Sequence, residues 1–244
     1  VAAGLGSRLK NLTENIPKCM LNFGGKTLLQ RQMQAYNECN IKNITVIRGY
    51  KKDKINYKNL NYITNPDYKN NNILNSIFYA ENIINGNIVI SYSDILFDTN
   101  VVKRLLESDH DISVVVDIDW QGYYVGRKDH PISEAENVIF DSNNKVVKIG
   151  KISTQKEEVH GEFIGMIKLS NRGAEEFKKH FYRVKKTYWG KPFQRAKIFQ
   201  KAYLTDMIQE LVDNGVKVHC VIIERGWKEI DTVEDYKKAL VEFK

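Results

Sequence analysis

The sequence has few cysteines and no long hydrophobic run, and these absences exclude several classes of protein. Cys19, Cys39 and Cys220 are odd in number and widely spaced, which argues against a disulfide framework and against a zinc site. The five histidines show no metal-ligand spacing. No apolar run approaches the roughly 20 residues of a membrane-spanning helix, and the basic-then-apolar start of a signal peptide is missing. We therefore expect a reducing, cytoplasmic setting and no membrane partner.

The chain also lacks internal repeats, long linkers and low-complexity segments, apart from an Asn-rich stretch at 70–75. Its 244 residues, 42% hydrophobic and 27% charged, suit a single domain spanning 1–244. The chain opens on Val1 rather than on methionine, and its first loop has no full strand before it. We therefore expect a missing upstream strand, and we leave open a homodimer or a larger multidomain parent.

The positive charge is unevenly distributed along the chain. Of a formal net charge of +7, much lies in the stretch 177–201. The aromatic residues between its lysines and arginines are Phe181, Tyr182, Tyr188, Trp189 and Phe193. Such interleaving can bind single-stranded nucleic acid, but a solvated helix followed by a loop, or a dimer contact, is more common. We expect no nucleic-acid partner.

Apolar strands alternate with helices in the first half of the chain. The patterns predict strands at 43–50, 87–94 and 111–119 and helices at 26–37 and 100–108. The helix at 26–37 is expected to bury Leu28, Leu29, Met33 and Tyr36. This alternation predicts an α/β fold with a Rossmann-like, mostly parallel but mixed sheet that has helices on both faces.

After about residue 120 the pattern becomes rich in strands. A hairpin at 137–150 is expected to turn at 142–144, and a strand follows at 161–170. We interpret about 120–170 as a β-rich insertion. Helices are predicted at 172–180 and 202–214, a strand at 217–224, and a final helix with a capping box between Thr232 and Asp235.

The opening loop, "AAGLGSRL" (2–9), is the first candidate functional segment. Backbone N–H groups of a glycine-rich turn can surround phosphate oxygens, because glycine permits close approach. The loop matches neither G-x-G-x-x-G nor G-x-x-x-x-G-K-[ST], so a plain tight turn is the alternative. Two further residues favour an anion site. Arg8 can grip phosphate oxygens with a planar fork, and Lys18 follows the rigid Pro17.

The 31 residues "AAGLGSRLKNLTENIPKCMLNFGGKTLLQRQ" (2–32) resemble the signature of nucleotidyltransferases of the sugar-phosphate and phosphocholine type. That signature runs L-A-A-G-x-G-x-R, then P-K, then a helix start. Val1 stands where leucine is usual. The resemblance implies that the loop wraps a nucleotide triphosphate, with Arg8 and Lys18 as catalytic residues stabilising its charge. It implies nucleotide contacts from Ala3 and Gly4, which would face the base, and from Leu5, Gly6 and Ser7.

Two aspartates are candidate Mg²⁺ ligands. Asp94 ends a strand, where ligands bind in doubly wound sheets, and the resemblance makes it a metal ligand. Asp231, in "GWKEIDTVEDY", matches an aspartate that such proteins carry just before the last helix. The alternatives are a solvent-facing loop residue for Asp94 and a helix cap for Asp231. Two carboxylates with Mg²⁺ would neutralise two phosphate groups brought side by side.

Further candidates concern the nucleotide and the acceptor. Asn72, Asn75 and Ser76 lie in an amide-rich stretch similar to one in phosphocholine-type members, so they are candidates for the nucleotide-binding pocket. The segments "VVVDIDW" and "HGEFIGMIKLS" resemble those of phosphonate cytidylyltransferases. By that resemblance Asp119 and Glu162, within the insertion, would bind the ammonium group of an acceptor. A surface position for either acid is the alternative.

The resemblance therefore implies a cytidylyltransferase that uses CTP and Mg²⁺ to couple CMP to 2-aminoethylphosphonate, releasing pyrophosphate. The first alternative acceptor is phosphocholine, because Trp120, Tyr123 and Tyr124 could form a cage for choline. A hexose 1-phosphate is the second. A regulatory module that binds nucleotide or RNA is the alternative outside the enzymes. The combination of Arg8, Lys18 and two aspartates argues against such a module.

Overall fold

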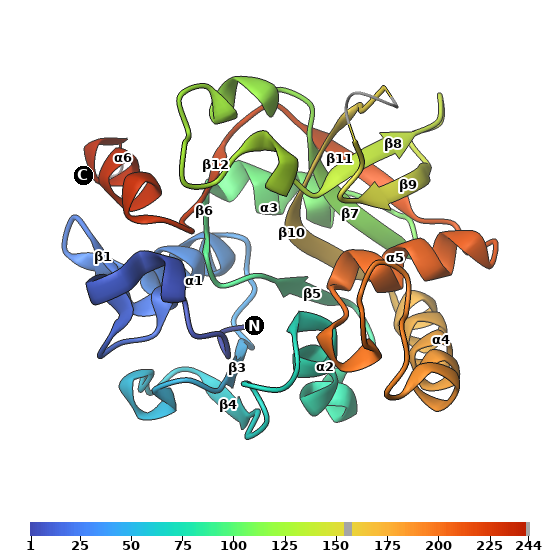
Figure 1. Ribbon diagram of the computed structural model, residues 1–244, viewed down its shortest axis with the longest axis horizontal. Helices are drawn as coiled ribbons and strands as arrows, with labels where there is room; N and C mark the ends of the chain where they lie inside the picture. The colour runs from blue at the N-terminus through green and yellow to red at the C-terminus, as the bar shows by residue number, and fades with distance from the viewer. Residues whose placement is uncertain (154–157, 243–244) are drawn as a thin grey trace.

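The structure is a computed structural model that describes residues 1–153 and 158–242 (Figure 1). Its largest sheet has the strand order β11-β7-β10-β8-β9, and β5 also pairs with β10. These strands are β5 (Ile88–Ser91), β7 (Ile112–Asp117), β8 (Asn137–Phe140), β9 (Val146–Gly150), β10 (Gly161–Leu169) and β11 (His219–Ile223). The predicted hairpin is confirmed, since β8 and β9 pair antiparallel and the chain turns between them.

The central sheet is mixed, as predicted, but most of its described pairings are antiparallel, whereas a mostly parallel sheet was predicted. Parallel pairing joins β7 to β11, whereas β10 runs antiparallel to β5, β7 and β8. The long strand β10 comes from the predicted β-rich region, so that region contributes a central strand of the sheet. Its register against β7 shifts between Phe163 and Ile167, around Gly165. A Cβ on Gly165 would lie 2.5 Å from the Tyr92 ring, so glycine is required at this bulge.

Three two-stranded pairs complete the strands. They are β1 (Asn22–Phe23) with β2 (Lys26–Thr27), β3 (Thr45–Arg48) with β4 (Asn61–Thr64), and β6 (Ile95–Phe97) with β12 (Trp227–Glu229). The β3–β4 pair is parallel. Ala2 forms a parallel bridge with Arg48 and donates a 2.8 Å hydrogen bond to the Ile47 carbonyl. The first residues therefore run alongside β3 and lead directly into the glycine-rich loop.

Five of the six described helices lie at predicted positions, with one difference in length, whereas the short helix at 73–77 falls in the amide-rich stretch, where no helix was predicted. The six are α1 (Leu28–Glu38), α2 (Ile73–Ile77), α3 (Thr99–Leu106), α4 (Asn171–Tyr188), α5 (Leu204–Asp213) and α6 (Val233–Glu242). The prediction ended α4 at 180, but Phe181 and Val184 continue its buried face at helical spacing. The basic stretch therefore begins as a helix that buries its apolar face. Among the described residues, no helix is long and apolar enough to cross a membrane.

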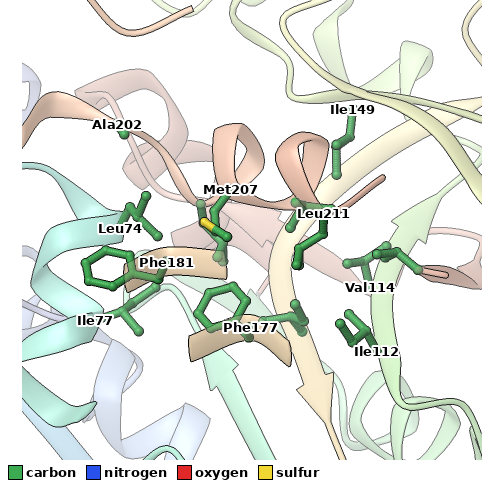
Figure 2. Close-up of a cluster of buried hydrophobic side chains, with 14 of the residues drawn as sticks. Leu74, Ile77, Ile112, Val114, Ile149, Phe177, Phe181, Ala202, Met207 and Leu211 are labelled. Carbon is green, nitrogen blue, oxygen red and sulfur yellow. The ribbon is translucent and has the colours of Figure 1, made fainter. Parts of the chain in front are cut away.

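Strand β7 is buried on both faces, as expected for a sheet between two layers of helices. Ile112, Val114 and Val116 belong to a cluster that includes residues of α2, α4 and α5 (Figure 2). Val115, pointing the other way, belongs to a second cluster with residues of α1 and α3. Figure 1 shows α4 and α5 together on one side, and α6 near the N-terminal elements on the other.

Truncating Phe177 tests how much of the stability depends on the packing of α4. Phe177 is fully buried, so Phe177→Ala should lower the free energy of unfolding in urea by about 3–5 kcal/mol. Tyr182 lies on the same helix but is 46% exposed, so Tyr182→Ala should cost about 1 kcal/mol or less. Equal losses in the two variants would contradict this arrangement.

Candidate functional site

The glycine-rich loop ends at a tight turn that brings Lys18 beside it. Gly6 has φ 63°, and it precedes the 3₁₀ segment Ser7–Thr13. The Thr13 hydroxyl donates a 2.8 Å hydrogen bond to the Gly6 carbonyl, which closes the turn. A Cβ on Gly6 would stand 3.4 Å from the Lys18 Cβ. A side chain at position 6 would therefore be strained by the left-handed backbone, and its Cβ would touch the lysine.

A cavity of about 180 Å³ opens beside this loop. Seven of the predicted residues line it, namely Ala3, Gly4, Gly6, Lys18, Asn72, Ser76 and Asp94. Tyr68 and Asn71, which were not predicted, also line it. Leu5, Ser7 and Arg8 belong to the loop but do not line the cavity, and Leu5 is 44% exposed. Asn75 donates hydrogen bonds to the carbonyls of Phe199 and Gln200, at 3.0 and 3.3 Å. It therefore fastens the segment after α4 to α2.

Lys18 lies between the two predicted metal ligands. Its ammonium donates to Asp94 Oδ2 at 3.0 Å and to Asp231 Oδ1, and Arg8 donates to Asp231 Oδ2. Burial alone would lower the pKa of Lys18, but Asp94 and Asp231 outweigh it and raise that pKa above its ordinary value. Burial disfavours the charged form of Asp231, yet Lys18, His130 and Arg8 hold its pKa well below the usual range. The structure thus brings these four predicted residues together.

The structure separates the role of Asp231 from helix capping. Thr232 Oγ1 accepts a 3.2 Å hydrogen bond from the Asp235 backbone N–H, and Asp235 Oδ2 accepts one of 2.8 Å from the Thr232 N–H. This is the predicted capping box. Because Thr232 and Asp235 cap α6, the Asp231 carboxylate is left to contact Lys18 and Arg8.

Asp94 has the surroundings of an oxygen ligand for a divalent cation. Its carbonyl accepts a 2.8 Å hydrogen bond from the Ile230 N–H, which joins the loop after β5 to the residue before Asp231. Its Oδ1 is buried and has no hydrogen-bond partner within the part of the chain that the structure describes. Mg²⁺ prefers carboxylate oxygens, so Asp94 and Asp231 fit the predicted metal.

Three residues that were not predicted form contacts with Asp231 or with one another, namely His130, Glu229 and Arg127. His130 Nδ1 lies 3.1 Å from Asp231 Oδ2, and Arg127 Nη2 lies 3.2 Å from Glu229 Oε2. One ligand atom from each of His130, Glu229 and Asp231 lies within 4.8 Å of the others. Glu229 could have been considered, because it is an acid only two residues before Asp231. Nothing in the sequence marks His130 or Arg127, which lie in an irregular segment.

The two predicted acceptor-binding acids do not lie with Lys18. Asp119 is exposed and lines a second cavity, of about 470 Å³, with Tyr123, Arg225 and Trp227. Glu162 is buried on β10 and accepts a hydrogen bond from the Tyr124 hydroxyl. Neither acid lines the cavity beside the glycine-rich loop.

The nearby aromatic residues do not form an open cage. Trp120 is only 1% exposed. The guanidinium groups of Arg127 and Arg225 each lie 4.7 Å from the centroid of the Tyr123 ring. Arg127 also lies 5.1 Å from the centroid of the Tyr124 ring. These aromatic faces are already in contact with cations of the protein itself.

Glu162 should make the stability depend on pH. Burial raises the pKa of Glu162 to about 8, whereas an unfolded glutamate titrates near ~4.3. As the pH rises between these values, the unfolded chain loses this proton and the native protein keeps it, so stability falls. In urea unfolding, wild type should lose on the order of 2–3 kcal/mol more than Glu162→Gln between about pH 5 and about pH 7.5.

Glu107 supplies the matched control for this measurement, because it is an exposed glutamate. Glu107→Gln should follow the wild-type dependence on pH. Parallel curves for wild type and Glu162→Gln would contradict a buried, protonated Glu162.

Comparison with known proteins identifies the family of this chain. The family described as a MobA-like NTP transferase domain matches residues 1–159. The CTP:phosphoglutamine cytidylyltransferase of Campylobacter jejuni subsp. jejuni serotype O:2 is 27% identical over 246 residues, covering 96% of this chain and 95% of that protein. The 2-aminoethylphosphonate cytidylyltransferase of Lancefieldella rimae is 25% identical over 157 residues, or 62% of this chain and 59% of that protein.

A solved structure has the same fold. The CTP:phosphocholine cytidylyltransferase from Streptococcus pneumoniae superimposes with a TM-score of 0.74 at 20% identity, covering 100% of this chain and 96% of that one. The predicted resemblance is therefore confirmed at the level of family and fold. The protein belongs to the MobA-like NTP transferase domain family and is a nucleotidyltransferase.

Proposed function

We propose that this protein is a cytidylyltransferase that transfers CMP from CTP to the phosphate or phosphonate group of a small acceptor. The observation that carries this proposal is the position of Lys18. Its ammonium lies between Asp94 and Asp231 at the wall of the cavity that Gly4 and Gly6 also line. A nucleotide triphosphate in this cavity would meet a fixed cation beside two carboxylates.

The proposed reaction joins two anions, so its barrier depends on charge. An acceptor oxygen attacks the α-phosphorus, a new P–O bond forms, and the bond to the β-phosphate breaks, so that pyrophosphate leaves. The neighbouring carboxylates raise the pKa of Lys18, which therefore stays protonated. Lys18 accordingly acts by stabilising charge at the phosphates and does not serve as a base. Arg8, whose side chain is 52% exposed, can turn from Asp231 to a bound phosphate.

Mg²⁺ is the cofactor we propose, with Asp94 and Asp231 as the residues that hold it. When bound, it would supply positive charge to the phosphate groups that must approach one another. Asp94 Oδ1 has no hydrogen-bond partner among the described residues, which supports this assignment, because a buried carboxylate oxygen without a hydrogen bond is costly unless a cation or a water completes it.

The acceptor we propose is a small phosphorylated compound that carries nitrogen. A relative that matches nearly the whole of both chains acts, by its name, on phosphoglutamine, and a second relative acts on 2-aminoethylphosphonate. We place a phosphoglutamine-like acceptor first and 2-aminoethylphosphonate second, because Asp119 and Glu162 lie outside the cavity of Lys18. Phosphocholine should be poorer, since the ring of Tyr123 is already covered by Arg127 and Arg225.

An acceptor panel tests this function. Pyrophosphate release is measured with CTP, Mg²⁺ and each of phosphoglutamine, 2-aminoethylphosphonate, phosphocholine and glucose 1-phosphate, and product masses are recorded. We expect a CMP-linked product with the first two acceptors, and we expect UTP to be a poorer substrate than CTP. Preference for glucose 1-phosphate, or equal use of UTP, would contradict the proposal.

The metal assignment predicts a specific effect of Asp231. Asp231→Asn should raise the Mg²⁺ concentration needed for half-maximal turnover and lower turnover on the order of a hundredfold. Helix α6 should keep its cap, because Thr232 and Asp235 form it. Asp109→Asn, at an exposed position, is the control. A folded Asp231→Asn protein with a normal Mg²⁺ requirement would remove Asp231 from the metal site.

A further inference from the structure

The irregular segment 121–135 brings a buried histidine to the carboxylates near Lys18. His130 is 3% exposed. Its Nδ1 lies 3.1 Å from Asp231 Oδ2 and 3.6 Å from Glu229 Oε2. One nitrogen and two carboxylate oxygens therefore converge within 4.8 Å of one another. Three donors of this kind, on two segments far apart in the sequence, are the composition of a metal site.

The two oxygens of Asp231 face different groups. Oδ1 accepts a hydrogen bond from Lys18, which also contacts Asp94. Oδ2 faces Arg8 and His130. The group of His130, Glu229 and Asp231 therefore lies on the Oδ2 side, whereas the pair of Asp94 and Asp231 shares Lys18 on the Oδ1 side. One carboxylate can thus take part in two distinct cation sites.

The charge of this region leaves room for a cation. The carboxylates are those of Asp94, Glu229, Asp231 and Asp235, and the side-chain cations among them are those of Arg8, Lys18 and Arg127. Burial raises the pKa of Glu229 well above its usual range, so a cation bound at this site would replace the Glu229 proton. Arg127 is bound to Asp235 through two nitrogens, at 2.7 and 3.0 Å. Arg8 is half-exposed, so it can leave Oδ2 without a change in the fold.

We propose that His130, Glu229 and Asp231 bind a divalent first-row transition-metal ion in preference to Mg²⁺. Mg²⁺ favours all-oxygen ligands, whereas an imidazole nitrogen favours transition ions, with affinity rising from Mn²⁺ to Co²⁺. An imidazole that binds a metal through Nδ1 uses the lone pair of that nitrogen and carries its proton on Nε2. This proposal depends on the proposed function in one respect only, which is that the metal ion would lie next to the reacting phosphates.

Metal titrations without nucleotide test this site. Binding of Co²⁺ and of Mg²⁺ is measured by calorimetry for wild type, His130→Gln and the exposed-histidine control His110→Gln. We expect His130→Gln to weaken Co²⁺ binding by about tenfold or more, with little change for Mg²⁺. A histidine that only oriented Asp231 would affect both ions alike. Equal losses for the two ions, or no loss for Co²⁺, would therefore overturn the proposal.

A second measurement uses the wild-type protein and does not depend on any variant folding. Mn²⁺ bound to the protein is examined by pulsed electron paramagnetic resonance for coupling to an imidazole ¹⁴N nucleus. A ¹⁴N coupling is expected, and an all-oxygen environment would refute the site. Neither experiment contains CTP or acceptor. Failure here would therefore leave the pyrophosphate assay in Mg²⁺ as an independent test of the proposed transferase activity.

Discussion

The contact between Lys18 and Asp231 connects the two ends of the chain at the point where the chemistry is proposed to occur. These residues are 213 positions apart in the sequence. Lys18 follows the glycine-rich loop, and Asp231 stands between β12 and α6. A buried cluster with Leu9, Leu21 and Ile230 packs the same two regions together, as Figure 1 shows for α6 and the N-terminal elements. The packing of this apolar cluster therefore holds Lys18 and Asp231 close enough to form their ion pair.

Ion pairs help to hold the segment 121–135 to this junction. Arg127 is almost fully buried and pairs with Asp235, the residue that also closes the capping box of α6. Breaking one partner of a buried pair leaves an uncompensated charge, whereas the intact pair adds little net stability. The pair of Arg127 and Asp235 is therefore better understood as fixing the position of the segment. Through it, the start of α6 determines where His130 lies.

The sequence predicted most of the helices and strands because their signals are local. A continuous apolar run marked β7 as buried on both faces, and Thr232 with Asp235 marked a helix start that the hydrogen bonds confirm. The loop, Lys18 and both aspartates could be identified from spacing and resemblance. The antiparallel pairings of β10 were not evident, since strand order depends on contacts between distant segments.

Side chains in irregular segments were the least predictable part of the candidate site. His130 and Arg127 reach Asp231 and Asp235 across about a hundred residues, and no periodicity carries that information. Glu162 differs from these residues, because its strand could be predicted but the surroundings of its carboxylate could not. The sequence does not reveal that the Tyr124 hydroxyl donates a hydrogen bond to that carboxylate. An acidic residue that belongs to a sequence motif can therefore be buried in the sheet and need not face a ligand. If the acceptor binds in the cavity of Lys18, as proposed, the groups that select it cannot be identified from the sequence positions of nearby acids.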